Sequence, residues 1–178
     1  MVTDPTLDDD RWGFFVKYKR KFWFEENDYD VPESYFYQNG EEIQPNTIEL
    51  VKRFLKQVRE SRGYDVDCCP PRMFESPFLP LPLEELRKGT RDFEKIACAR
   101  IVEAAECAIQ KISEETSHSY KLVEVEKAVM TGALVYFMTL TAEEEDGGSV
   151  KTIQAAVFHP IGGSPVLREW RFKPITAH

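Results

Sequence analysis

The chain has 178 residues, of which 42% are hydrophobic and 30% are charged, and its net charge at pH 7 is −8. A chain of this length and composition can bury a hydrophobic core in one domain without a disulfide or a metal ion. The negative charge disfavours nucleic acid and anionic membrane surfaces as partners.

The first ten residues, MVTDPTLDDD, contain neither a basic region nor an apolar run, so no secretory signal is expected. No stretch approaches the roughly 20 apolar residues that span a bilayer. Cys98 and Cys107 lie nine residues apart on a predicted helix, too far for a bridge within it, and Cys68 and Cys69 are adjacent. Free thiols in a reducing compartment are expected, and with them a cytoplasmic or nuclear location.

Residues 1–62 are predicted to form an N-terminal extension, and residues 1–45 of it are rich in aromatic side chains. That much aromatic surface is rarely left in water, so this segment is expected to pack against something. Basic and aromatic residues alternate in Lys17–Lys21, as they do at some nucleic-acid contacts, but acidic clusters on both sides favour a solvated edge or turn.

A helix is predicted near 47–62. Asn46 and Glu49 form an approximate capping box at its start, and Gly63 is placed to end it. The apolar residues that share one face of this helix are Ile48, Val51, Leu55 and Val58. Residues 64–89, which contain five prolines, are predicted to be an extended connector without a helix or strand.

A longer helix is predicted from Asp92 to about Ser113, and the rest of the chain is organised around it. Thr90 is expected to cap its start, and Asp92 suits the positive end of the helix dipole. Small side chains in its apolar stripe would let the helix lie close against a concave surface. The stripe consists of Phe93, Ala97, Ile101, Ala104, Ala108 and Ile112. The opposite, solvent-facing side of the helix is predicted to carry Glu103, Glu106 and Gln110.

Four strands are predicted after this helix, over 120–130, 133–142, 150–159 and 166–173. Alternation places two apolar faces on the second strand, so a layer is expected on each side of the sheet. One of these faces consists of Leu134, Tyr136, Met138 and Leu140, and the other of Val135, Phe137, Thr139 and Thr141. On the last strand, Val166, Trp170 and Phe172 are expected to share one face. The sequence therefore predicts an α+β fold in which an antiparallel sheet cradles one long helix.

The order and spacing of these segments resemble the cystatin family, and more closely the plant cystatin-related proteins. The segments that carry the resemblance are 62–67, 119–128, 136–142 and 157–160, and together they cover roughly residues 62–174. The resemblance implies a cystatin-like domain over residues 63–178, in which one long helix packs on a curved antiparallel sheet. The extra helix and the aromatic-rich extension of residues 1–62 lie outside it.

Cystatins reversibly inhibit papain-like cysteine proteases by inserting a three-part wedge into the active-site cleft. The resemblance implies a wedge here, with Ala128 in place of a glutamine, Met130 in place of a valine and Ile161 in place of a tryptophan. Gly132 is expected at a turn that can require positive φ. The candidate protease-binding residues are Gly63, Ala128, Val129, Met130, Thr131, Gly132, Pro160 and Ile161.

Two alternatives stand beside inhibition. The first is a non-inhibitory protein-interaction module on the same fold, whose working surface includes Trp12 and Trp23. The second is a ligand pocket in a related cone-shaped fold. No catalytic residue, metal site or cofactor is expected, because the three histidines form no His-x-x-x-His pair and the four cysteines no Cys-x-x-Cys pair. The expected partner is a papain-like cysteine protease or another, unidentified protein, with no nucleic acid and no membrane.

Overall fold

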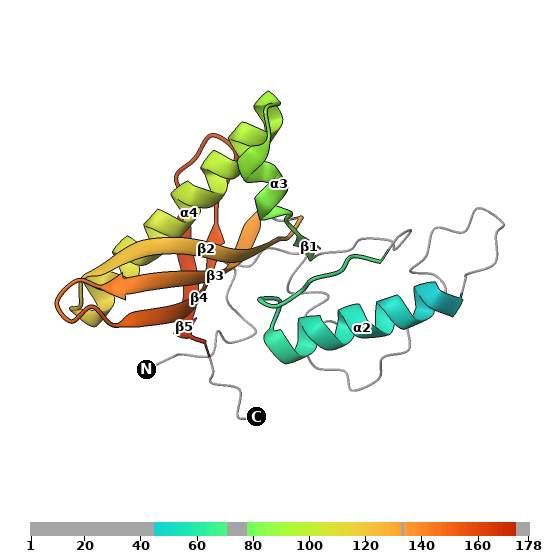
Figure 1. Cartoon of the computed structure of the whole chain (residues 1–178), viewed down its shortest axis with the longest axis horizontal. Helices are drawn as coiled ribbons and strands as arrows, with labels where there is room; N and C mark the ends of the chain where they lie inside the picture. The colour runs from blue at the N-terminus through green and yellow to red at the C-terminus, as the bar shows by residue number, and fades with distance from the viewer. Residues whose placement is uncertain (1–44, 71–77, 133, 174–178) are drawn as a thin grey trace.

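The computed structural model describes residues 45–70, 78–132 and 134–173 (Figure 1). The strands form one five-stranded antiparallel sheet in the order β1-β2-β3-β4-β5, with a long helix packed on it, which confirms the predicted α+β class. The elements in chain order are α2 (Pro45–Ser61), β1 (Leu79–Pro80), α3 (Leu83–Lys88), α4 (Asp92–Thr116), β2 (Tyr120–Met130), β3 (Val135–Glu144), β4 (Val150–Phe158) and β5 (Val166–Phe172).

The long helix α4 lies on one face of the sheet, as predicted. Alanines on its buried side allow the helix to approach the strands closely, because they carry no bulk beyond Cβ. The predicted stripe holds from Ile101 onward, but Phe93 is 58% exposed. The first turns of α4 lie beside α3 and away from the strands (Figure 1). The buried residues of α4 are Ile101, Ala104, Ala105, Ala108, Ile109 and Ile112.

The cap of α4 differs from the prediction. Arg91, and not Thr90, is the residue before the helix, with extended backbone at φ −74° and ψ 145°. The Glu94 carboxylate reaches back to the Arg91 backbone N–H at 3.0 Å and also binds its guanidinium. The prediction for Thr90 was wrong because the helix begins at Asp92, which leaves Thr90 one residue too early, and the Glu94 N–H donates to Arg91 O at 3.0 Å.

The strand β2 curves around α4 because it contains two bulges. Its register against β3 shifts between Leu122 and Glu124 and again between Val125 and Lys127. Leu122, Val125 and Ala128 consequently all face the α4 side, at steps of three residues and not two. Each extra residue bends the strand and increases its twist, which lets the sheet follow the surface of the helix.

A third bulge overturns one prediction on β5. Val157 pairs with Leu167 and Ala156 with Glu169, so Arg168 is an extra residue between them. Because of it, Leu167 and Trp170 both pack against the α4 cluster although they differ in parity. Val166, the neighbour of Leu167, therefore does not share a face with Trp170 as predicted.

Residues 64–89 were predicted to be a connector without a helix or strand, because they contain five prolines. This prediction was wrong, since the segment includes the strand β1 and the helix α3. Pro80 is tolerated because β1 is an edge strand, and Pro82 stands at the N-cap of α3. Leu81 donates its N–H to Ala128 O at 2.9 Å, next to the β1–β2 ladder. The Arg87 guanidinium of α3 donates to Val125 O at 2.7 Å and pairs with Glu124 at 3.3 Å. These contacts attach α3 to the outer edge of β2.

Buried side chains of α2 and of the segment that follows it pack against the other face of the sheet. The helix is buried along the predicted face from Val51 onward, whereas Ile48 is 42% exposed. Gly63 ends α2 as predicted, with φ +87° and its N–H on Val58 O at 2.9 Å. The buried residues of this second cluster are Val51, Phe54, Leu55, Val58, Tyr64, Val66, Phe78, Val129, Val135, Phe137 and Ala156.

The two faces of β3 follow the predicted alternation from Val135 onward, but Leu134, which was predicted on the strand, lies in the turn before it with φ +59°. Tyr136, Met138 and Leu140 belong to the α4 cluster, and Val135 and Phe137 belong to the α2 cluster. A layer on each side of the sheet, as predicted, therefore explains why both faces of this strand are apolar. The aromatic-rich segment 1–44, with Trp12 and Trp23, lies outside the described residues.

Candidate functional site: two turns at one edge

The β2–β3 turn and the β4–β5 turn lie at the same end of the sheet. This follows from the antiparallel order, because β2 and β4 end where β3 and β5 begin. The backbone N–H of His159 donates to Leu134 O at 3.0 Å and joins the two turns directly. We call this surface the two-turn edge and define it as Thr131, Gly132, Leu134 and residues 159–165.

The β2–β3 turn is closed by Thr131, which is only 4% exposed. Its N–H donates to Val135 O at 2.9 Å, and its hydroxyl accepts the Val135 N–H at 3.3 Å. Positive φ occurs at Leu134, with φ +59°, and not at Gly132. The expectation for Gly132 was therefore wrong, because the turn adopts the left-handed conformation two residues later. A Cβ added to Gly132 would meet no atom within 4 Å.

The β4–β5 turn presents the most exposed large apolar side chain of the described residues, Ile161, at 83%. Gly162 follows with φ +70°, a conformation that favours glycine. The N–H of Gly163 donates to Pro160 O at 3.3 Å, and Pro160 itself is half-buried. The turn therefore holds an isoleucine out in solvent on a hydrogen-bonded loop.

A buried histidine attaches this turn to α4. His159 is 2% exposed, and the Arg100 guanidinium donates to the backbone carbonyls of His159 and Pro160. The Nδ1 of His159 lies 3.3 Å from Arg100 O, and its Nε2 lies 3.3 Å from a Glu103 carboxylate oxygen. The sequence interpretation placed His159 only at a strand end. The sequence feature that could have indicated the role of His159 is a polar residue directly after a buried strand and next to a turn.

The other candidate residues lie outside the two-turn edge. Ala128 and Val129 are buried on opposite faces of the sheet, in the α4 cluster and the α2 cluster respectively. Met130 is half-buried and packs against the α4 cluster. Gly63 is buried on the α2 face, where an added Cβ would lie 2.5 Å from Phe78 Cε1. The structure thus brings Thr131, Gly132, Pro160 and Ile161 together at the two-turn edge, with Met130 directly behind them.

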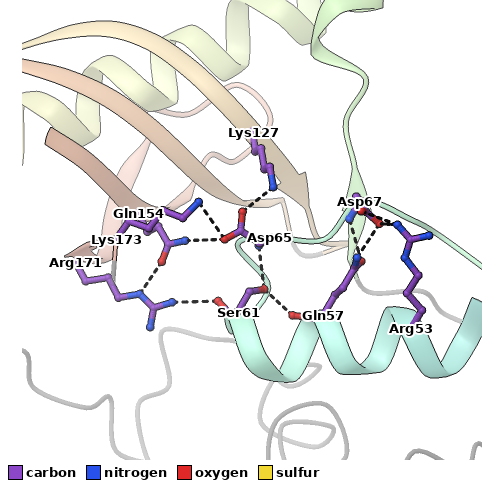
Figure 2. Close-up of polar contacts among 9 residues, drawn as sticks. All are labelled: Arg53, Gln57, Ser61, Asp65, Asp67, Lys127, Gln154, Arg171 and Lys173. Carbon is purple, nitrogen blue, oxygen red and sulfur yellow. Dashed lines mark hydrogen bonds and ion pairs between the residues drawn. The ribbon is translucent and has the colours of Figure 1, made fainter. Parts of the chain in front are cut away.

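A polar network on the α2 face fixes the segment after α2 to the sheet (Figure 2). Asp65 accepts from Lys127 Nζ of β2 at 2.8 Å and from Gln154 Nε2 of β4 at 3.4 Å, and it pairs with Lys173 at 3.4 Å. Its own N–H donates to Ser61 Oγ at 2.9 Å. We call the set Ser61, Asp65, Lys127, Gln154, Arg171 and Lys173 the Asp65 latch.

The charges of the latch decide the protonation of Asp65. Burial acts to raise the pKa of Asp65, but the hydrogen bond from Lys127 and the charges of Lys127 and Lys173 outweigh it, so the pKa is lowered. Arg171 completes the network, since it donates to Gln154 Oε1 at 2.8 Å and to Ser61 O at 3.1 Å. The latch therefore depends on an ionised carboxylate.

Two further polar contacts flank the latch. The Asp67 carboxylate accepts from Gln57 at 2.8 Å and from Arg53 at 2.8 and 2.9 Å, and these bonds lower the pKa of Asp67. Tyr64 donates its hydroxyl to Glu169 at 3.0 Å, and burial together with the Glu169 carboxylate raises the pKa of Tyr64 well above its usual value. The sequence interpretation missed this network, although acidic and apolar residues alternate in the segment YDVD.

The carboxylates, histidines and cysteines of the described residues bear on what chemistry these sites can support. Within residues 45–70, 78–132 and 134–173, no group of three or more His, Cys, Asp or Glu side chains could hold a metal ion. No disulfide joins the four cysteines, and burial raises the pKa of the Cys68 and Cys107 thiols. A raised pKa disfavours the thiolate, which is the nucleophilic form.

The chain matches no protein-family model, no curated protein and no solved structure. No helix in the described part of the chain is long and apolar enough to cross a membrane. The resemblance to cystatins accordingly remains a hypothesis, which rests on the sequence segments quoted above.

Proposed function

We propose that this chain is a non-enzymatic protein-binding module with a cystatin-like fold, and that it reversibly inhibits a papain-like cysteine protease. In this proposal the two-turn edge enters the protease cleft and blocks it without offering a cleavable bond. The observation that carries the proposal is the pairing of the two turns. They lie at one end of the sheet and are joined by the hydrogen bond from the His159 N–H to Leu134 O at 3.0 Å. Ile161, in the second of these turns, is 83% exposed to solvent.

The composition of the edge sets the expected affinity. Burial of one isoleucine contributes about 1.5–3 kcal/mol, and the edge has no tryptophan or tyrosine, the residues that most often dominate interfaces. Gly132 adds a backbone surface without a side chain, which suits close approach to another chain. We therefore expect inhibition in the micromolar range, about −8 kcal/mol of binding free energy, and not in the picomolar range.

The test is a titration of the folded chain into papain, with hydrolysis of a fluorogenic peptide as the signal. Ile161→Asp should raise the inhibition constant at least about tenfold, because it places a charge where an apolar side chain would be buried. Val150→Asp is the matched control, since Val150 is 63% exposed at the opposite end of the sheet. Ile161 is better suited than Met130, whose replacement would also disturb the core.

Two outcomes would contradict inhibition of this enzyme class. One is the absence of inhibition by a folded sample at about 100 µM, well above the expected constant. The other is inhibition that Ile161→Asp and Val150→Asp weaken equally, because the binding surface would then lie elsewhere.

A specific observation favours a second candidate, a non-inhibitory interaction module on the same fold. In cystatins one part of the wedge is a flexible segment around a glycine near the N-terminus of the domain. Gly63 is the candidate for that glycine in this chain, but it is buried against Phe78 with φ +87°. A segment held in this way does not extend into a cleft. If papain is not inhibited, binding of other proteins should be sought with Ile161→Asp and with Trp12→Ala and Trp23→Ala, which separate the two-turn edge from the aromatic segment.

A further inference from the structure

We propose that His159 is a proton-sensitive joint that positions the two turns relative to each other, so that the two-turn edge binds a protein partner more tightly at acidic than at alkaline pH. The inference about binding rests on the proposed function. The inference about the joint itself rests only on the contacts of His159.

His159 connects three parts of the molecule. Its N–H reaches the β2–β3 turn at Leu134 O, and its own carbonyl accepts from the Arg100 guanidinium of α4. Its side chain lies in the interior, 2% exposed, with the ring centroid 6.4 Å from that of Tyr136 on β3. A shift of this residue would therefore move the end of β4 and the start of the exposed turn together.

Both nitrogens of the ring face oxygen acceptors. Nδ1 lies 3.3 Å from the backbone carbonyl of Arg100, and Nε2 lies 3.3 Å from the Glu103 carboxylate. Neutral imidazole carries one N–H and can donate to only one of these oxygens, whereas imidazolium donates to both. The geometry thus matches the protonated ring, which forms a hydrogen bond with α4 on each side.

The charged and titratable groups that face this ring in the described part of the chain are Glu103, Arg100 and Tyr136. Glu103 favours the charged ring, but its side chain is 57% exposed, so water screens part of the attraction. Histidine is the side chain whose charge ordinarily changes between about pH 5 and pH 8, so a contact that uses both ring N–H groups is sensitive to pH.

Loss of the proton has a defined structural consequence. One ring nitrogen becomes an acceptor that faces another acceptor, and the exposed Glu103 side chain is free to turn into solvent. The bonds from Arg100 to the two carbonyls remain, so the turn loosens but is not released. Protonation therefore strengthens the joint, and loss of the proton as pH rises weakens it.

The test uses NMR on the full chain, labelled at histidine, from pH 5 to pH 8. The wild-type spectrum should show protons on both ring nitrogens of His159 at the acidic end, and its backbone amide should exchange more slowly there after correction for intrinsic rates. Glu103→Gln should move the midpoint of this transition to lower pH, because it removes the facing charge. Glu106→Gln, the same change on an exposed residue of α4, should leave the midpoint unchanged. His118, which is exposed, provides an internal reference.

The proposal is overturned if His159 remains in one neutral tautomer across this range, or if Glu103→Gln and Glu106→Gln behave alike. These results do not depend on any protease. In the papain assay, wild-type inhibition should weaken from pH 5.5 to pH 7.5, and Glu103→Gln should reduce that dependence. A chain with the NMR transition but without inhibition would retain the joint and lose the proposed function, so the two failures are distinguishable.

Discussion

The two faces of the sheet hold their helices by different means. On the α4 face, alanines such as Ala104 and Ala108 lie against apolar strand residues, and the buried residues of this cluster are all hydrophobic. On the α2 face, the apolar cluster is smaller and the segment after the helix is also held by the Asp65 latch, which includes Gln154 at 1% exposure. The α4 face is stabilised by shape and apolar burial, and the α2 face in part by charge.

This difference predicts different responses to pH and salt. Apolar burial is insensitive to both over the ordinary range, whereas ion pairs weaken when a carboxylate is protonated or when salt screens it. We therefore expect α2 to be the part of the described structure that detaches first under acid. The following substitutions test whether the two faces of the sheet differ in this way.

The largest effect is expected from Leu140→Ala on the α4 face, which should lower the free energy of unfolding by about 2–5 kcal/mol. Leu140 is fully buried, as is Leu55 on the α2 face. Leu55→Ala should accelerate hydrogen exchange in α2 and leave β3 amides protected, while Leu140→Ala should reduce protection throughout the sheet. If Leu55→Ala lowers protection in β3 as much as in α2, the two faces unfold as one unit.

The next largest effect is expected from Gly63→Ala, which should lower the free energy of unfolding by about 2–3 kcal/mol. The substitution imposes φ +87° on a residue with a side chain and places its Cβ 2.5 Å from Phe78 Cε1. Urea unfolding of the variant measures the loss. Gly132→Ala is the control and should change stability by less than about 0.5 kcal/mol, because its added Cβ meets no atom within 4 Å.

Asp65→Asn should lower the free energy of unfolding by about 1–2 kcal/mol at pH 7, because it removes the negative charge that pairs with Lys127 and Lys173. Since the folded-state pKa of Asp65 is lowered, its contribution is complete above the unfolded value of about 3.9 and is lost as pH falls through the folded pKa. The difference between wild type and variant should therefore disappear in acid and shrink in high salt. Asp146→Asn, in the exposed β3–β4 turn, should show neither behaviour.

The smallest effect is expected from Thr139→Val, which should raise the free energy of unfolding by about 1 kcal/mol. Thr139 is fully buried on the α2 side of β3, and its hydroxyl has no hydrogen-bond partner among the described residues. Valine keeps the shape and removes the unsatisfied group. Thr141→Val is the matched control on the same strand, and it should not stabilise the chain because the Thr141 hydroxyl binds Glu126. Thermal unfolding at a common scan rate compares the two.

The strongly periodic parts of the fold were predictable from the sequence. The α4 stripe from Ile101 to Ile112 and the alternation over β3 each repeat a simple period, so the elements and their buried sides followed. The end of α2 was predictable as well, because a glycine after an apolar helix favours the left-handed conformation that Gly63 adopts.

The remaining features depend on contacts that a local pattern does not contain. The extra residue at Arg168 changes the parity of β5, and a bulge is decided by the pairing with β4. The prolines at 80 and 82 favoured a connector, but an edge strand and a helix start both accept proline. Asp65 has a partner 89 residues away in the chain, Gln154, and His159 has one 59 residues away, Arg100, so their roles required the fold.

The contact between α3 and β2 bears on how the chain behaves at high concentration. An exposed edge strand is a template for sheet growth between molecules, and β1 covers only two residues of the long strand β2. Arg87 occupies the Val125 carbonyl on this edge, and two bulges interrupt its regular ladder. The short helix α3 therefore protects β2 against strand addition and aggregation.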